Sequence, residues 1–180
     1  MGSANQMTIS SIQQGLIVQQ EFAKLLMMGS NGRVELAAPV SDDERRDYEV
    51  HVHGQYGFDL AIQVKSSTRL HRLAVNPRYL MILFDVQADR LVNSPFFWYF
   101  FAYLDPKLMR FGEPTFLIPS RDFHENAAPR RRGDLWKFTL AASMEPKTRD
   151  KWHPYRVGTH ELGARVLEIM GELKKHRSAA

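Results

Sequence analysis

The chain has 180 residues, of which 44% are hydrophobic and 24% are charged, proportions typical of a globular protein and not of a disordered or fibrous one. It contains no cysteine, which excludes disulfides, thiolate zinc sites and cysteine nucleophiles, so any metal must be held by oxygen or imidazole ligands. Its 24 Lys and Arg against 20 Asp and Glu give a net charge of +4, which suits a polyanionic partner such as nucleic acid.

Length and hydropathy also bound the organisation of the chain. We expect a single domain over 1–180, because this length suffices for one well-buried core. Residues 1–8 are interpreted as a disordered or vector-derived start and are left out of the fold prediction. No segment reaches the roughly 18 consecutive apolar residues that span a bilayer, and the polar start lacks the apolar core of a signal peptide. A soluble, cytoplasmic protein is therefore expected.

Helical periodicity marks both ends of the chain. Apolar residues recur every three or four positions before Gly29, which predicts a helix that Ser10 or Ser11 caps and Gly29 ends. A second helix is predicted to run to about His176, with Thr159 as its N-cap.

Between these helices, short apolar or alternating runs bounded by Gly and Pro predict β-strands. The glycines of 54–57 indicate a hairpin, and 67–78 is interpreted as a polar connection with about one helical turn. The apolar run 79–86 predicts a central strand covered on both faces, and 125–134 a solvated loop. The expected strands are 33–38, 47–53, 58–66, 79–86, 96–104, 115–118 and 135–142. This order predicts an α/β protein with a mixed central sheet flanked by helices.

A polar constellation lies on the predicted hairpin. If Asp47, Gln63 and Lys65 share a face, a carboxylate, an amide oxygen and an ammonium converge, and such a set can hold a hard cation and activate water. A two-residue turn would place Gln63 opposite Tyr48, on the wrong face. A three-residue turn or one bulge would pair Glu49 with Gln63 and Asp47 with Lys65. We therefore predict an odd-length turn or a bulge.

These residues resemble the PD-(D/E)xK superfamily of restriction-endonuclease-like proteins, in the Q-x-K variant found in prokaryotic members. In that family an acidic residue begins the second core strand, as Asp47 does, and the (D/E/Q)-x-K motif ends the third, as Gln63, Val64 and Lys65 do. An upstream helix often supplies another acid, which Glu21 matches. The resemblance covers roughly the first half of the chain. Asp47 is not preceded by Pro, and Gln63 replaces an anionic ligand.

The resemblance implies a restriction-endonuclease-like fold and a metal-dependent nuclease that hydrolyses phosphodiester bonds. It implies DNA rather than RNA as the substrate, and a role in defence, repair or mobile-element biology. It implies Mg²⁺ or Mn²⁺ held by Asp47, Gln63 and the Val64 carbonyl. Lys65 would polarise the attacking water, and Glu21 would orient Lys65 or bind the metal through water. The alternative is a catalytically inactive module of the same fold that binds nucleic acid or a protein, because the neutral Gln63 removes one charge from the site.

Other segments carry weaker signals. Two basic runs are candidates for phosphate contacts, although solvation alone also explains them: Arg130, Arg131 and Arg132, and, on the last helix, Lys174, Lys175 and Arg177. The aromatic segment 96–103 fits a buried core or a homo-oligomer interface better than a platform for stacking bases. His51 and His53 share a strand face but lack a third metal ligand. Asp42 and Asp43 would replace Asp47 if the strand began earlier.

Overall fold

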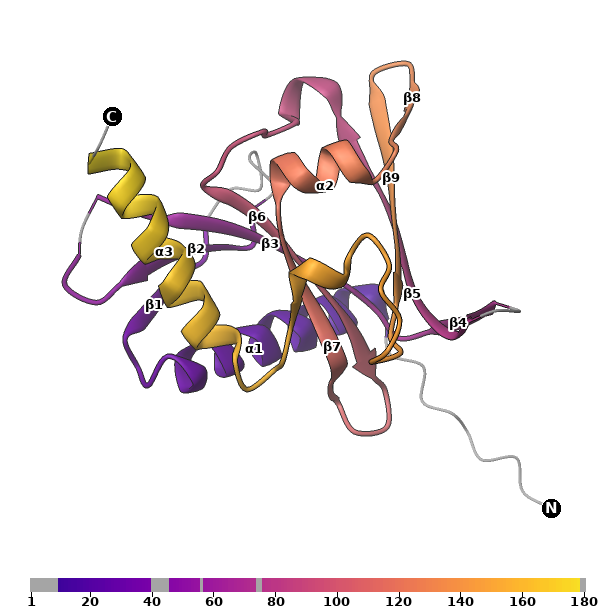
Figure 1. The fold of residues 1–180 in the computed structure, drawn as a ribbon, viewed down its shortest axis with the longest axis horizontal. Helices are drawn as coiled ribbons and strands as arrows, with labels where there is room; N and C mark the ends of the chain where they lie inside the picture. The colour runs from indigo at the N-terminus through magenta and orange to yellow at the C-terminus, as the bar shows by residue number, and fades with distance from the viewer. Residues whose placement is uncertain (1–9, 40–45, 56, 74–75, 179–180) are drawn as a thin grey trace.

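The computed structural model describes residues 10–39, 46–55, 57–73 and 76–178; the predictions made for residues 1–8, Asp42 and Asp43 lie outside them. Two sheets, here called sheet A and sheet B, form the framework (Figure 1). Sheet A consists of β1 (Val34–Ala37), β2 (Tyr48–Val52), β3 (Leu60–Ser67), β6 (Phe97–Asp105), β7 (Arg110–Pro119) and β10 (Arg156–Val157), in that order. Sheet B consists of β4 (Leu70–Leu73), β5 (Asn76–Gln87), β9 (Leu135–Ser143) and β8 (Arg130–Arg132), in that order.

Sheet A is mixed: β3 and β6 are parallel, and its other neighbouring strands are antiparallel. Helices α1 (Ser11–Gly29) and α3 (Leu162–Ser178) pack on one face of this sheet. The chain makes sheet B in two excursions, one between β3 and β6 and one between β7 and β10. The second excursion also contains α2 (Ser120–Asn126), and short 3₁₀ turns lie at Ala88–Arg90 (η1) and His153–Tyr155 (η2). The predicted α/β class with a mixed, helix-flanked sheet is confirmed, whereas the sequence did not reveal the second sheet.

Capping and a close helix contact explain the limits of the two long helices. Ser10 and Gln13 form a capping box, in which each side chain accepts a hydrogen bond from the other's backbone N–H. Gly29 ends α1 as predicted, but the reason for glycine is the close approach of α3. A Cβ on Gly29 would lie 3.0 Å from the backbone N of Gly163 in α3. Thr159 is not the N-cap of α3, which begins at Leu162, because its N–H and hydroxyl both donate to the Glu113 carboxylate.

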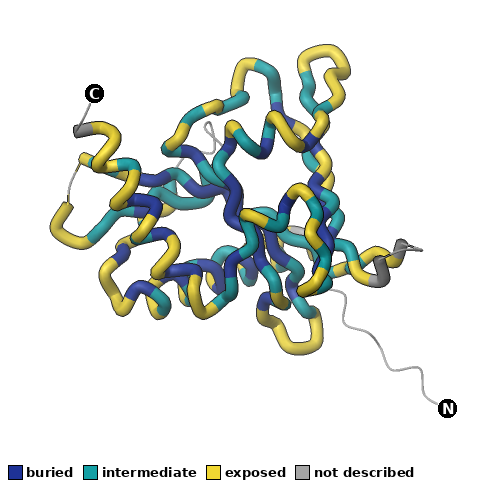
Figure 2. The backbone as a smooth tube through the Cα atoms, viewed as in Figure 1, coloured by how far each residue is buried: buried dark blue, intermediate teal, exposed yellow. Residues whose placement is uncertain are grey.

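Strand β6 separates the two hydrophobic cores. Phe100 contributes to the core between sheet A and the helices, whereas Phe97, Tyr99 and Phe101 contribute to the core between the two sheets. In Figure 2, buried stretches of the chain gather around β6. Aromatic side chains therefore occupy both faces of β6 because both faces are covered, which confirms the buried-core interpretation. No residue of 96–103 is fully exposed, and a homo-oligomer formed through this segment stays a prediction.

Three expectations about sheet B were wrong. Where a polar connection was expected over 67–78, Leu70–Leu73 form β4 and β5 begins at Asn76, and 125–134 contains the end of α2 and strand β8. Strand β5 lies between two others, but one of its faces is open, as the 69% exposed Leu83 shows. Short strands such as β4 and β8 are held by ladder hydrogen bonds to a neighbouring strand. Their sequences have no hydrophobic period from which a strand could be predicted. No helix among the described residues is long and apolar enough to cross a membrane.

Candidate functional site

The β2–β3 hairpin sets the geometry of the candidate site. Its ladder pairs Tyr48 with Ile62, then Glu49 with Ala61 and Val50 with Leu60. This register has the parity of an odd-length turn, as predicted, and the two-residue turn is excluded. The predicted pairing of Asp47 with Lys65 is wrong, because the turn is longer than three residues and the register is offset by two, so Asp47 comes level with Gln63.

The Asp47 carboxylate is held from two sides. One oxygen, Oδ2, accepts a hydrogen bond from the Val64 N–H at 2.6 Å, and the other, Oδ1, accepts one from the Gln19 side-chain amide at 2.9 Å. Because the Ala61 N–H donates to the Phe96 carbonyl of β6, the N–H and C=O of Val64, an odd number of residues away, point toward β2. The structure thus brings the Asp47 carboxylate to the backbone of the Gln-Val-Lys motif. Sequence analysis missed Gln19, since a glutamine in a helix carries no signal for such a contact.

Tyr48 fixes the entry of β2 against α1. Its hydroxyl donates to the Gln19 carbonyl at 3.0 Å, and its ring stacks on Phe22. Burial, and then the nearby negative charge of Asp47, raise the pKa of the Tyr48 phenol. The same helical turn therefore anchors both Tyr48, through a carbonyl, and Asp47, through a side-chain amide.

The residues of the Gln-Val-Lys motif point to opposite faces of β3. Val64 lies in the core under the helices. Lys65 points toward sheet B, with its Nζ 5.6 Å from the centroid of the Phe84 ring. Gln63 has the parity of Lys65, is 5% exposed, and its amide hydrogen-bonds to none of the described residues. Its side chain lies level with Asp47 across the β2–β3 ladder.

Glu21 lies on α1, on the helical side of sheet A. Its side chain is almost fully buried and forms an ion pair with Lys24 one turn along the helix. The described contacts of Glu21 are therefore local to α1, and the role proposed for it beside Lys65 stays a prediction.

One carboxylate bridges His51 of β2 and His53, which directly follows that strand. Glu35, directly opposite His51 on β1, accepts from His51 Nε2 at 2.9 Å with one oxygen and contacts His53 Nδ1 with the other. These contacts lower the pKa of Glu35. No group of three or more His, Cys, Asp or Glu side chains suited to a metal ion occurs in the described part of the chain. Any ion at the Asp47 site would accordingly depend on amide and carbonyl oxygens as well as on one carboxylate.

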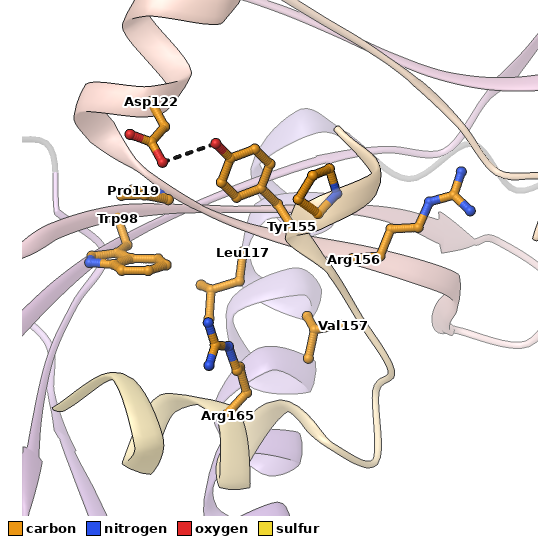
Figure 3. A pocket seen from close by; sticks show the side chains of 9 residues that line it. Trp98, Leu117, Pro119, Asp122, Tyr155, Arg156, Val157 and Arg165 are labelled. Carbon is orange, nitrogen blue, oxygen red and sulfur yellow. Dashed lines mark hydrogen bonds between the residues drawn. The ribbon is translucent and has the colours of Figure 1, made fainter. Parts of the chain in front are cut away.

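Two of the cavities among the described residues are lined by sheet A near the elements discussed above. A cavity of about 260 Å³ adjoins the candidate site on the face of Gln63, since its lining includes the paired residues Glu49 and Ala61. A second, of about 200 Å³, opens between Trp98, Arg165 and Tyr155 (Figure 3). There the Tyr155 hydroxyl donates to Asp122 at 2.9 Å, and burial together with this carboxylate raises the Tyr155 pKa to about 12. The second cavity lies on the helical side of sheet A, away from Lys65, and no sequence signal pointed to it.

Comparison with known proteins shows the fold. No family model matches the sequence, and no curated protein matches it in sequence. Among solved structures, the bacterial homing endonuclease I-Ssp6803I is similar to this chain, with a TM-score of 0.56 over 94% of this chain and 99% of that one, at 19% sequence identity. The two chains share an overall fold over nearly their full lengths.

Proposed function

We propose that this protein is a nuclease that cleaves DNA and requires Mg²⁺ or Mn²⁺. The observation that carries the proposal is the Asp47 carboxylate, held against the Val64 N–H inside the Gln-Val-Lys motif. The overall fold of the chain is similar to that of a homing endonuclease, and this similarity supports DNA as the substrate. A role in defence, repair or mobile-element biology belongs to the same proposal.

The side chains at the site suit a hard divalent cation. Mg²⁺ prefers oxygen ligands and keeps several waters, so one carboxylate with two neutral oxygens suffices for a weak site. Asp47 would supply the carboxylate, Gln63 the amide oxygen, and Val64 its carbonyl, which points toward β2 like its N–H. When bound, such an ion lowers the pKa of a coordinated water and offsets phosphate charge.

The chain's own groups would then orient the reactants. Gln19 and the Val64 N–H fix the Asp47 carboxylate, so its position does not have to be found during the reaction. Lys65 is a half-buried residue whose Nζ lies over the Phe84 ring. From there it would donate hydrogen bonds to the attacking water or to the scissile phosphate, and so stabilise the charge that develops there.

One observation favours a second candidate, a non-catalytic module that binds nucleic acid. Among the described residues, Asp47 is the carboxylate that contacts the Gln-Val-Lys motif, Gln63 is neutral, and the acid of α1, Glu21, is paired with Lys24. Fewer anionic ligands weaken metal binding, and a protein of this fold without a bound ion would bind DNA without cutting it.

Incubating the protein with plasmid DNA, single-stranded DNA and RNA in Mg²⁺, Mn²⁺ or EDTA tests the proposal. We expect cleavage of DNA only with a divalent ion, and a loss of at least roughly 100-fold in Lys65→Ala. Lys107→Ala, which removes an exposed lysine at the β6–β7 turn, should cleave like the wild type. If every protein binds DNA but leaves all substrates intact, the non-catalytic module is correct. Equal activity of Lys65→Ala and wild type would refute the assigned site.

A further inference from the structure

The positive charge of the chain is concentrated in sheet B. Segments 66–90 and 128–143, which contain its four strands, have eight Lys and Arg against three Asp and Glu, a net charge of +5. The remainder has 16 against 17, a net charge of −1, so sheet B exceeds the +4 of the whole chain. A polyanion is therefore attracted to sheet B more than to the rest of the molecule.

The β8–β9 hairpin carries the densest part of this charge. Arg130, Arg131 and Arg132 are all exposed, and none has a carboxylate of the described residues within ion-pair distance. Arg130 lies opposite Lys137 on β9, so Arg130, Arg132 and Lys137 share one face of the ribbon. Of these three cations, Lys137 is near a carboxylate, with its Nζ 3.4 Å from Asp85.

The hairpin is held in shape by its own contacts. Its two-residue turn begins at Gly133, whose φ of 60° suits glycine, and the Asp134 carbonyl accepts a hydrogen bond from the Ala88 N–H at 2.8 Å. On the second face of the ribbon, the Arg131 guanidinium lies 5.7 Å from the centroid of the Trp136 ring. The ribbon projects from the body of the molecule at the end of sheet B (Figure 1). A preformed projection of this kind loses little conformational entropy on binding.

The ladder of sheet B relates the hairpin to the candidate site. Phe84, which lies below Lys65, pairs with Phe138 on β9, and Trp136 is two residues further toward the turn. Two residues of a strand span roughly 7 Å, which is about two base-pair steps at roughly 3.4 Å per nucleotide of one strand. A duplex at Lys65 would therefore have phosphates or a groove at the level of the hairpin.

We propose that the β8–β9 hairpin is a contact surface for duplex DNA, and that Arg130, Arg132 and Lys137, on the face of the ribbon turned away from Phe84 and Lys65, bind phosphates. A two-stranded ribbon fits the major groove, which is roughly 12 Å wide, with its cations reaching the backbone. This proposal takes its substrate from the proposed nuclease function, but it concerns binding alone.

Binding of the full-length protein to a fluorescently labelled duplex, in EDTA so that no cleavage occurs, tests the surface. The double substitution Arg130→Ser with Arg132→Ser should weaken binding about tenfold or more at moderate salt. It should also reduce the slope of log K against log salt by roughly 1.8, since each phosphate contact contributes about 0.9. The matched control, Lys107→Ser with Arg110→Ser at the β6–β7 turn, removes the same charge from two exposed positions and should leave the slope unchanged. Thermal unfolding of both variants verifies that they are folded.

The outcomes separate this proposal from the nuclease proposal. Loss of affinity and slope in the hairpin variant supports the surface even if the wild type cuts nothing in Mg²⁺ or Mn²⁺. An unchanged slope in the hairpin variant overturns the surface even if the wild type cleaves DNA. Equal losses in the β6–β7 control, tighter binding to single-stranded DNA or double-stranded RNA of the same sequence, or no binding of the wild type to the duplex would also overturn it.

Discussion

Replacing Asp47 should lower the stability of the protein as well as any activity, because its carboxylate accepts two hydrogen bonds in the structure. In Asp47→Ala, the Val64 N–H of a central strand loses its acceptor, and an unsatisfied buried donor costs about 1–3 kcal/mol. In Asp47→Asn, the side-chain oxygen still accepts from Val64, and the Gln19 amide can rotate to accept from the new donor. We therefore expect Asp47→Asn to lose less than about 1 kcal/mol.

Urea unfolding, followed by tryptophan fluorescence and circular dichroism, measures both variants against the wild type. For a chain of this length, each kcal/mol shifts the melting temperature by roughly 2–4 °C, so the expected order of stability is also resolved by thermal melts. If Asp47→Ala unfolds at the same urea concentration as the wild type, the two hydrogen bonds do not hold β2 to β3 and α1. If Asp47→Asn is the less stable variant, the assignment of donors and acceptors here is wrong.

Three further expectations follow from the structure. Gly163→Ala would place a Cβ 2.2 Å from the backbone N of Ser30 and should lower the free energy of unfolding in urea by at least about 2 kcal/mol. Gly171→Ala, in the same helix but with open space around it, should raise it by about 0.5–1 kcal/mol. Similar effects of the two substitutions would contradict the contact between α1 and α3. Burial lowers the pKa of His124 to about 4, so between pH 6.5 and 4 this histidine is neutral in the folded protein and protonated in the unfolded chain. The free energy of unfolding should therefore fall as the pH drops from about 6.5 toward 4. His124→Gln should flatten that dependence, and an unaltered pH profile would contradict the lowered pKa of His124. Gln19→Leu should raise the Mg²⁺ concentration for half-maximal cleavage about tenfold or more, while Gln14→Leu on the same helix should not, and the reverse result would remove Gln19 from the site.

The sequence predicted those elements that have a strong hydrophobic period or a distinct end signal. The N-cap, predicted at Ser10 or Ser11, and the alternating strand of β9 are local features, and the structure confirms them, with Ser10 as the N-cap. Strand β8 consists of three arginines, so it carries no apolar pattern and exists because β9 offers it ladder hydrogen bonds. The partition into two sheets is also non-local, since it depends on which distant strands pair.

At the candidate site, parity was predictable but register was not. The polar alternation around Asp47 and Gln63 required an odd-length turn, and the observed ladder has that parity. The length of the turn decides which residues are opposite, and Gly54 and Gly57 alone do not set it. Gln19 was out of reach because its contact with Asp47 spans 28 positions and arises from how α1 packs on the sheet.

The second sheet also has a consequence for how the chain folds and unfolds. Strand β5 belongs to the connection between β3 and β6, and β9 belongs to the connection between β7 and β10. Their ladder runs from Tyr79–Ser143 to Gln87–Leu135, so each rung closes a loop of 48 to 64 residues, the differences between those paired positions. Neither sheet is a contiguous stretch of chain, so cleavage at one peptide bond cannot release either one intact. Native pairing in sheet B requires both the connection between β3 and β6 and the connection between β7 and β10 to be in place. Closing loops of this length favours slow folding with one cooperative transition.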